Sequence, residues 1–179
     1  ERPYLLYLSR LEHPGKNHLR LMEAFARSPV RATHRLVFAG PDWGAGPLII
    51  QRRAELGLGG LVALAGAVPT ETLPGLIRQS DGVLMLGLLE GFGLPALEGL
   101  ACGRAVLASS TGALPEVVGP LGTLCDPTDV ASIASGLVRL TRDRRLRRRA
   151  SSEGPGRARS FSWDRTAQGL LEVCREVAP

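Results

Sequence analysis

Two glutamates, Glu90 and Glu98, lie eight positions apart in the segment LLEGFGLPALEGLACG, on either side of a Gly-Phe-Gly turn. Taken singly, Glu90 is equally well explained as a solvated loop residue, and Glu98 as a first-turn acid that complements a helix dipole. Together they follow the apolar segment GVLMLG and precede a helical pattern. Two acids on one strand-to-helix loop, with glycines and a proline between them, favour a binding site.

The glycines and the proline of this segment indicate how the loop is built. Gly91 and Gly93 allow a turn that side chains would obstruct. Pro95 suits the first position of a helix, because its ring presets the backbone and no amide proton is missed there. The amides of Gly93 and Leu94 are then unpaired at a helix start, where they favour a phosphate group. Glu98 follows about one turn later and is expected at the same rim.

Lys16 is the single lysine among 22 basic residues. A GC-rich coding bias would explain the excess of arginine and leave this lysine to chance. Alternatively, position 16 requires a compact ammonium group and not the planar fork of arginine. The residue types alone leave both explanations open.

Short apolar segments alternate with longer amphipathic ones along the chain. Most of the short segments are apolar throughout, as expected for strands that are covered on both faces. The pattern predicts strands at residues 4–8, 36–40, 61–65, 82–86, 105–108 and 122–125. It predicts helices near residues 17–27, 46–57, 70–79, 95–102, 113–118, 128–142, 143–157 and 164–178.

This alternation predicts an α/β fold, a Rossmann-like open parallel sheet with helices on both faces. In such folds ligands bind beyond the carboxyl ends of the strands, which is where the loop of Glu90 is expected. Residues 1–179 are predicted to form a single domain with its closing helix near 162–178, and no internal repeat is found.

The composition favours a folded globular protein and argues against several other classes. A hydrophobic content of 44% supports a folded globule, and no apolar run reaches the ~18–20 residues of a membrane helix. The cysteines, Cys102, Cys125 and Cys174, are far apart and odd in number, which argues against a disulfide framework and a zinc site. They suit a reducing cytoplasm. The abrupt start on a strand-like segment suggests a piece of a longer protein, although a short natural protein stays open.

The segment E-GFGLPAL-E resembles the signature of group 1 (family 4) retaining glycosyltransferases of GT-B fold. The resemblance covers nearly the whole chain. YLLYLSRLEHPGKNHLRLMEAFA resembles the opening strand, phosphate loop and first helix of that family, and SSTGALPEVVG resembles its glycine-rich loop after strand five. The chain resembles the C-terminal, donor-binding domain, one of the two that face a cleft in such enzymes. It departs from the family at Ser9, where glycine is usual, and at Leu86-Gly87, where Pro-Ser is usual.

The resemblance implies roles for eight residues. Arg10 and Lys16 match the pair that contacts the donor diphosphate, and Glu90 matches the acid near the hydroxyls of the transferred sugar. These three are the catalytic candidates. Glu98 matches the acid that accepts hydrogen bonds from the ribose hydroxyls. The other donor-binding candidates offer backbone amides to the sugar and phosphate or lie beside the base, and they are Phe92, Gly93, Leu94 and Val68.

The activity that the resemblance implies is transfer of a sugar from a nucleotide-diphosphate sugar to an acceptor hydroxyl with retention of configuration. An N-terminal acceptor-binding domain is the implied partner. No cofactor is implied, and no cluster of carboxylates or histidines in the sequence suggests a metal site. A noncatalytic nucleotide-sugar-binding module stays open as the alternative. The expected location is the cytoplasm, with peripheral membrane contact where the acceptor is lipid-linked.

Two other functions fit the sequence less well. A nicotinamide dinucleotide enzyme requires G-x-G-x-x-G after the first strand, whereas the loop SRLEHPGKN holds one glycine. Nucleic-acid binding would rest on RLTRDRRLRRRA, residues 139–150, with its seven arginines. Leu140, Leu146 and Ala150 interrupt it at near-helical spacing, so an ordinary solvated helix face is predicted and no specific nucleic acid is expected. Contact of this face with an acidic membrane surface stays open.

Three residues outside the motif receive structural predictions. Trp163 is predicted to anchor the last helix by burial. His34 lies in a polar connector and is predicted at the surface. His18 flanks the phosphate loop, where a surface or packing role is favoured over contact with a ligand.

Overall fold

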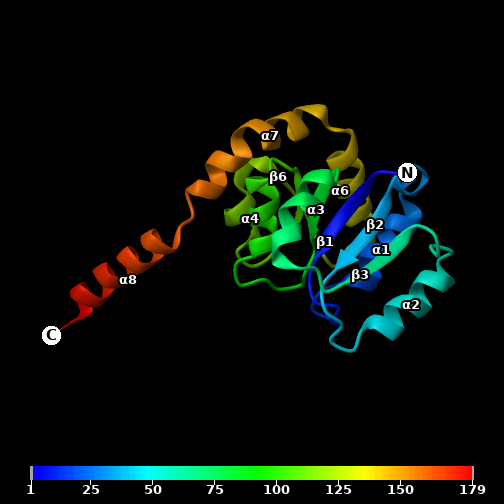
Figure 1. The fold of residues 1–179 in the computed structure, drawn as a ribbon, viewed down its shortest axis with the longest axis horizontal. Coiled ribbons are helices and arrows are strands. Elements are labelled where there is room, and N and C mark those ends of the chain that lie inside the picture. The colour runs from blue at the N-terminus through cyan, green and yellow to red at the C-terminus, as the bar shows by residue number, and fades with distance from the viewer. Residues whose placement is uncertain (1, 179) are drawn as a thin grey trace.

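The computed structural model describes residues 2–178, and within this range six parallel strands form one sheet. The strands are β1 Tyr4–Leu8, β2 Arg35–Ala39, β3 Val62–Gly66, β4 Gly82–Met85, β5 Val106–Ser109 and β6 Gly122–Cys125. Their order in space is β3-β2-β1-β4-β5-β6 (Figure 1). The chain changes direction across the sheet between β1 and β4, and open α/β sheets bind ligands at such a switch point. The predicted α/β class and Rossmann-like parallel sheet are confirmed.

The central strands are apolar because helices cover both faces of the sheet. β1 pairs with β2 from Tyr4↔Arg35 onward and with β4 from Leu5↔Gly82 onward. Every residue of β4 and β5 is buried. The loops that follow β1, β4 and β5 therefore open at one side of the sheet, the carboxyl edge. The loops that precede β4 and β5 open at the opposite side, the amino edge.

The helices match the predicted ones within two residues at each end, with one exception. They are α1 His18–Arg27, α2 Gly46–Glu55, α3 Leu73–Gln79, α4 Leu94–Ala101, α5 Leu114–Val118, α6 Val130–Arg142, α7 Arg144–Arg159 and α8 Trp163–Val177. The exception is the segment 70–79, which opens with the 3₁₀ turn Thr70–Thr72 before α3 begins. Two further 3₁₀ turns, Pro29–Ala32 and Gly119–Leu121, are not predicted by the pattern.

Helices α6 and α7 start later than predicted because an aspartate caps each of them. The Asp129 carboxylate accepts a hydrogen bond from the Ala131 amide at 2.8 Å, and Asp143 accepts one from the Leu146 amide at 2.9 Å. A capping residue has non-helical backbone angles and stands outside the helix. The helices α6 and α7 therefore begin one residue after each cap.

The helices form two groups around the sheet. α1 packs against α2 and α6, whereas α4 packs against α3, α5 and α7. The buried stripe of the arginine-rich region is the predicted one, since Leu140, Leu146 and Ala150 are all buried. This region is therefore a helix pair with a solvated basic face.

The last helix, α8, extends away from the sheet (Figure 1) and has no buried residue. The predicted burial of Trp163 is wrong, because its side chain is 81% exposed. Leu170 and Leu171 of α8 are also exposed. In the described range, no helix combines the length and the apolarity that a bilayer span requires.

His34 is the second correction. It was predicted at the surface, but it is 9% exposed. The 3₁₀ turn before it folds the connector back, so that His34 Nε2 lies 3.1 Å from Asp81 Oδ2 and Nδ1 lies 2.8 Å from the Thr33 hydroxyl. A polar side chain can be buried here because both ring nitrogens have partners.

Candidate functional site

The loop after β1 is tied to the loop after β4 at the carboxyl edge. Asn17 takes a left-handed backbone conformation with φ 58°. Its side-chain amide donates to the Leu86 carbonyl at 3.1 Å and to the Pro127 carbonyl at 2.7 Å. The Leu88 amide donates to the Gly15 carbonyl at 2.9 Å. These bonds fix the position of Lys16 relative to the segment that carries Glu90.

Lys16 and Glu90 form a close ion pair. The distance from Lys16 Nζ to Glu90 Oε1 is 2.6 Å, and the two side chains are only 15% and 9% exposed. The backbone of Glu90 is held as well, because its carbonyl accepts a hydrogen bond from the Ala113 amide at 3.2 Å. A Cβ at Gly112 would collide with that carbonyl, and a Cβ at Gly87 would collide with the carboxylate. The pair therefore depends on Gly112, where φ is +60° and only glycine fits, and on Gly87, where a side chain would displace the Glu90 carboxylate.

Arg10, Val68 and Glu98 line one cavity at the carboxyl edge. Its volume is about 260 Å³, and its walls come from the ends of β1 and β2, the loop after β3 and the start of α4. The loss of solvent around the Glu98 carboxyl raises its pKa above the usual value of 4.5. A raised pKa marks a carboxylate that would gain from hydrogen-bond donors brought by a ligand.

Trp43 is a residue of this site that the sequence analysis does not identify. The Arg10 guanidinium lies over the Trp43 ring, 4.5 Å from its centroid. The Trp43 amide donates to the Leu11 carbonyl at 2.9 Å, which holds the loop after β2 beside the loop after β1. Trp43 is 64% exposed, so the stacked pair lies at the surface of the site. The available signal was an aromatic residue directly after the strand-ending segment AGPD.

Gly93 caps the amino end of α4, the third side of the site. Its backbone is left-handed with φ 86°, and a Cβ there would collide with Leu114. Gly91 does not have a positive φ, so the prediction that both glycines are needed for the turn holds only for Gly93. The helix begins at Leu94, which places Pro95 at its second position and not its first.

The side chains of Phe92 and Leu94 line a different, apolar cavity of about 420 Å³. Phe161 and Trp163 lie on its other side, and the rings of Phe92 and Phe161 meet edge-on with centroids 5.6 Å apart. Neither residue lines the carboxyl-edge cavity of Arg10, Val68 and Glu98. The amide contacts that the family resemblance implies for them stay a prediction.

His18 has a packing role and not a ligand-binding one. It lies between Tyr7 and Phe38, with ring centroids 5.0 and 4.9 Å away, and its Nε2 lies 3.1 Å from the Ser9 hydroxyl. Burial lowers the pKa of His18 to about 4, so the ring is neutral at physiological pH.

The predicted site residues lie at one edge of the sheet but fall into three parts. Lys16 pairs with Glu90; Arg10, Val68 and Glu98 surround the cavity; and Phe92, Gly93 and Leu94 form the start of α4. Among residues 2–178, no group of three or more His, Cys, Asp or Glu side chains is arranged to hold a metal ion. The arrangement offers two cations, two carboxylates and a helix start around the switch point.

Comparison with known proteins gives the family. The model described as "Glycosyl transferases group 1" matches residues 1–157. The chain is 33% identical over 163 residues to O-antigen chain mannosyltransferase B of Escherichia coli, covering 90% of this chain and 42% of that protein. It is 34% identical over 178 residues to D-inositol 3-phosphate glycosyltransferase of Corynebacterium jeikeium, covering 96% of this chain and 42% of that protein.

Solved structures confirm the architecture. Sucrose-phosphate synthase of Thermosynechococcus elongatus superposes with a TM-score of 0.85 and 27% sequence identity. The match covers 99% of this chain and 46% of that structure. The chain thus spans less than half the length of each of these three proteins.

Proposed function

This chain belongs to the group 1 glycosyltransferase family, and on that basis we propose that it binds a nucleotide-diphosphate sugar at the carboxyl edge of its sheet. The single observation that supports this most is the cavity shared by Arg10, Val68 and Glu98 at the switch point, with the Lys16–Glu90 pair nearby. In the proposed complex, ribose hydroxyls donate to Glu98, and Val68 lies beside the base.

The diphosphate is the group that this site is proposed to stabilise during transfer. Negative charge grows on the diphosphate as its bond to the sugar breaks. Arg10, Lys16 and the amides of Gly93 and Leu94 are proposed to meet that charge. Removing one such donor costs about 3–4 kcal/mol of barrier in comparable sites, or roughly 100- to 1000-fold in rate.

Lys16 is proposed to exchange or share partners when the donor binds. Without the donor, its ammonium group is neutralised by Glu90. A diphosphate brings stronger negative charge to the lysine, and the sugar hydroxyls then give Glu90 hydrogen-bond donors in its place. In the free state, the pair therefore neutralises two buried charges. In the proposed bound state, Lys16 contacts the diphosphate and Glu90 contacts the sugar hydroxyls.

We further propose that a complete enzyme, with an N-terminal acceptor-binding domain, transfers the sugar to an acceptor hydroxyl with retention. The support is the family and the E-GFGLPAL-E segment, whose acids lie at the same edge. The proposal includes no metal and places the protein in the cytoplasm. A noncatalytic nucleotide-sugar-binding module remains the second candidate, because the chain spans only 42% of the relatives named above.

Two experiments test these proposals. A thermal-shift panel of UDP, GDP, ADP and their sugar derivatives identifies the donor, since a ligand at 100 times its dissociation constant stabilises by ~2.7 kcal/mol. No stabilisation by any of them would refute donor binding.

NMR of the product formed by the complete protein then gives the anomeric configuration. An inverted product refutes retention, and binding without any turnover supports the noncatalytic module.

A further inference from the structure

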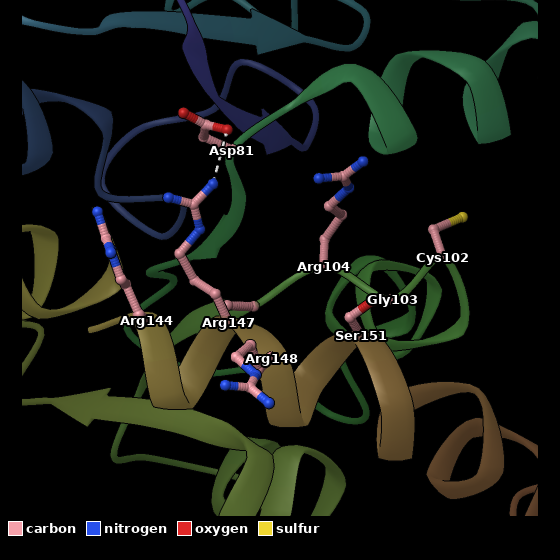
Figure 2. Close-up of a pocket in the computed structure, with 9 residues that line it drawn as sticks. Asp81, Cys102, Gly103, Arg104, Arg144, Arg147, Arg148 and Ser151 are labelled. Carbon is pink, nitrogen blue, oxygen red and sulfur yellow. Dashed lines mark hydrogen bonds and ion pairs between the residues drawn. The ribbon is translucent and has the colours of Figure 1, made fainter. Parts of the chain in front are cut away.

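A second cavity lies at the amino edge of the sheet, opposite the proposed donor site. It has a volume of about 400 Å³ and is walled by Asp81 before β4, the segment between α4 and β5, and one face of α7 (Figure 2). We call it the amino-edge pocket. Its polar lining residues are Asp81, Arg104, Arg144, Arg147, Arg148 and Ser151.

Close packing fixes α7 over this pocket. Gly154 of α7 lies against the backbone of Leu100 in α4, where a Cβ would come 2.5 Å from the Leu100 carbonyl oxygen. Gly103 has φ +69°, and a Cβ there would lie 3.3 Å from the Ser151 Cα. Residues 144, 147, 148 and 151 are spaced by three, one and three positions, so they share one helix face. The backbone positions of Arg144, Arg147 and Ser151 are therefore fixed beside the pocket.

The positive charge of the pocket is mostly uncompensated. Asp81 is the one carboxylate among its lining residues, and it already has two partners. Arg147 Nη2 lies 3.0 Å from its carboxylate, and His34 Nε2 lies 3.1 Å from it. In the part of the chain from 2 to 178, Arg104, Arg144 and Arg148 form no ion pair. The Nε of Arg104 is also buried without any hydrogen-bond partner.

Other arginines of the same helical region are neutralised locally. Arg139 lies 3.8 Å from Asp143, and Arg149 lies 3.0 Å from Glu153. A buried guanidinium N–H that lacks an acceptor costs free energy, and so does the gathering of like charges in a hollow. An anionic ligand in the amino-edge pocket would remove the second of these costs by neutralising the gathered charges.

We propose that the amino-edge pocket binds a phosphate-bearing anion. Guanidinium groups match the oxygens of a phosphate with paired N–H donors. Figure 2 shows the side chains of Arg104, Arg144 and Arg147 extending to the same side of α7, whereas Arg148 is turned away. Arg104 and Arg144 supply the free donors, and Arg147 is held in place by Asp81. The volume lies within the lower range of small-molecule sites, so a phosphate carrying one small substituent fits.

Titration of the 179-residue chain with inorganic pyrophosphate, followed by ¹⁵N NMR, tests this proposal. Binding here moves the amide signals of Gly103 and Ser151, whereas binding at the proposed donor site moves those of Gly93 and Leu94. The two sites are thereby distinguished, and the pocket stands even if the donor proposal fails.

Two substitutions and a matched control sharpen the test. Arg144→Gln alone and together with Arg104→Gln is expected to weaken pyrophosphate binding at Gly103 and Ser151 by at least tenfold. Arg145→Gln removes the same charge from the next position of α7, which does not line the pocket. It is expected to change the affinity less than twofold. The exposed position of Arg144 keeps the test valid if the double variant fails to fold.

Vesicles identify the source of the phosphate. Co-sedimentation with phosphatidylglycerol vesicles, but not with phosphatidylcholine vesicles, that is lost in Arg144→Gln and kept in Arg145→Gln assigns a lipid headgroup. Binding of pyrophosphate without vesicle binding assigns a soluble phosphate compound. The proposal is overturned if neither probe binds at this pocket, or if Arg145→Gln weakens binding as much as Arg144→Gln.

Discussion

In the absence of a donor, the ion pair between Lys16 and Glu90 sets the arrangement of these two side chains in the site. The two residues are 74 positions apart, so the sequence predicts each of them in the site but not their pairing. The pair is largely buried, and a buried ion pair that loses one partner leaves an uncompensated charge. Its role in holding the fold is therefore separable from its proposed role in binding.

We expect Lys16→Ala to lower the free energy of unfolding by roughly 3 kcal/mol, because Glu90 is left buried and unpaired. Glu90→Gln in the same chain should restore a large part of that loss by removing the charge. Urea unfolding measures both. Arg27→Ala, which breaks the exposed pair with Glu23, serves as the control and should cost less than about 1 kcal/mol. If Lys16→Ala and Arg27→Ala lower the free energy of unfolding equally, the buried pair contributes no more to stability than the exposed pair.

His18 gives the protein a specific dependence of stability on pH. Its pKa is lowered from 6.5 to about 4 by burial, so the unfolded chain takes up a proton between these values and the folded chain does not. Stability is therefore lost as the pH falls from 6.5 toward 4, by about 3 kcal/mol in total. Replacement by glutamine should remove this contribution. A pH profile of unfolding whose slope is the same in wild type and His18→Gln would contradict the assignment.

A local sequence pattern does not show which distant segment will contact a side chain, and this limited several predictions for single residues. Arg10, Val68 and Glu98, which the family resemblance names as candidates, line one cavity, and their roles there stay predictions. Trp163 and His34 were misplaced because burial depends on which distant segment covers a side chain. The contact of Arg10 with Trp43 joins two loops that follow neighbouring strands. The aromatic residue itself is visible in the sequence, but its pairing with Arg10 is not.

At the scale of elements, the sequence predicts nearly all of the sheet and its helices. Uniformly apolar strands and amphipathic helices leave few alternatives for the order of elements. What the pattern misses are short 3₁₀ turns and the capping positions Asp129 and Asp143, where one side-chain hydrogen bond sets the first helical residue. These bonds depend on local geometry that periodicity does not describe.

The start of α4 requires glycine at position 93 and not at position 91. We expect Gly93→Ala to destabilise the protein by roughly 2 kcal/mol, because an alanine would have to adopt φ 86° and would press on Leu114. Gly91→Ala is the matched control, since no atom lies within 4 Å of a Cβ at that position, and it should change stability by less than about 0.5 kcal/mol. Thermal unfolding of the two variants compares them, and a smaller effect at position 93 than at 91 would refute this account of the turn.

At the scale of the whole molecule, one core holds the sheet and the helices through α7, and α8 stands outside it. Its large apolar residues, including Trp163 and Leu170, are mostly exposed. The first turn of α8 borders the apolar cavity of Phe92 and Phe161, and no described residue of α8 is buried. Helix α8 therefore contributes little to the stability of the domain.

Truncation of the chain after Thr166 should leave the Tm within about 2 °C of the full chain, because residues 167–178 bury no side chain. The truncation keeps Trp163 and Thr166 at the apolar cavity. Differential scanning calorimetry measures the difference. A fall of more than about 4 °C would mean that α8 packs on the domain in solution.

Two cavities lined by charged residues lie at opposite edges of the sheet. The carboxyl edge combines acids with cations, as a ligand with both hydroxyl and phosphate groups requires, whereas the amino edge gathers arginines around one carboxylate. This division predicts that a nucleotide sugar and a simple phosphate compound bind without competing for the same residues.

Calorimetric titration with the nucleotide identified by the thermal-shift panel tests the central claim most directly. Lys16→Ala and Glu98→Ala should each weaken binding at least tenfold, or about 1.4 kcal/mol, while Arg145→Gln at the far end of the molecule retains the affinity of the unaltered chain. If both of the first two variants, shown to be folded by circular dichroism, bind as tightly as the unaltered chain, the carboxyl edge is not the donor site.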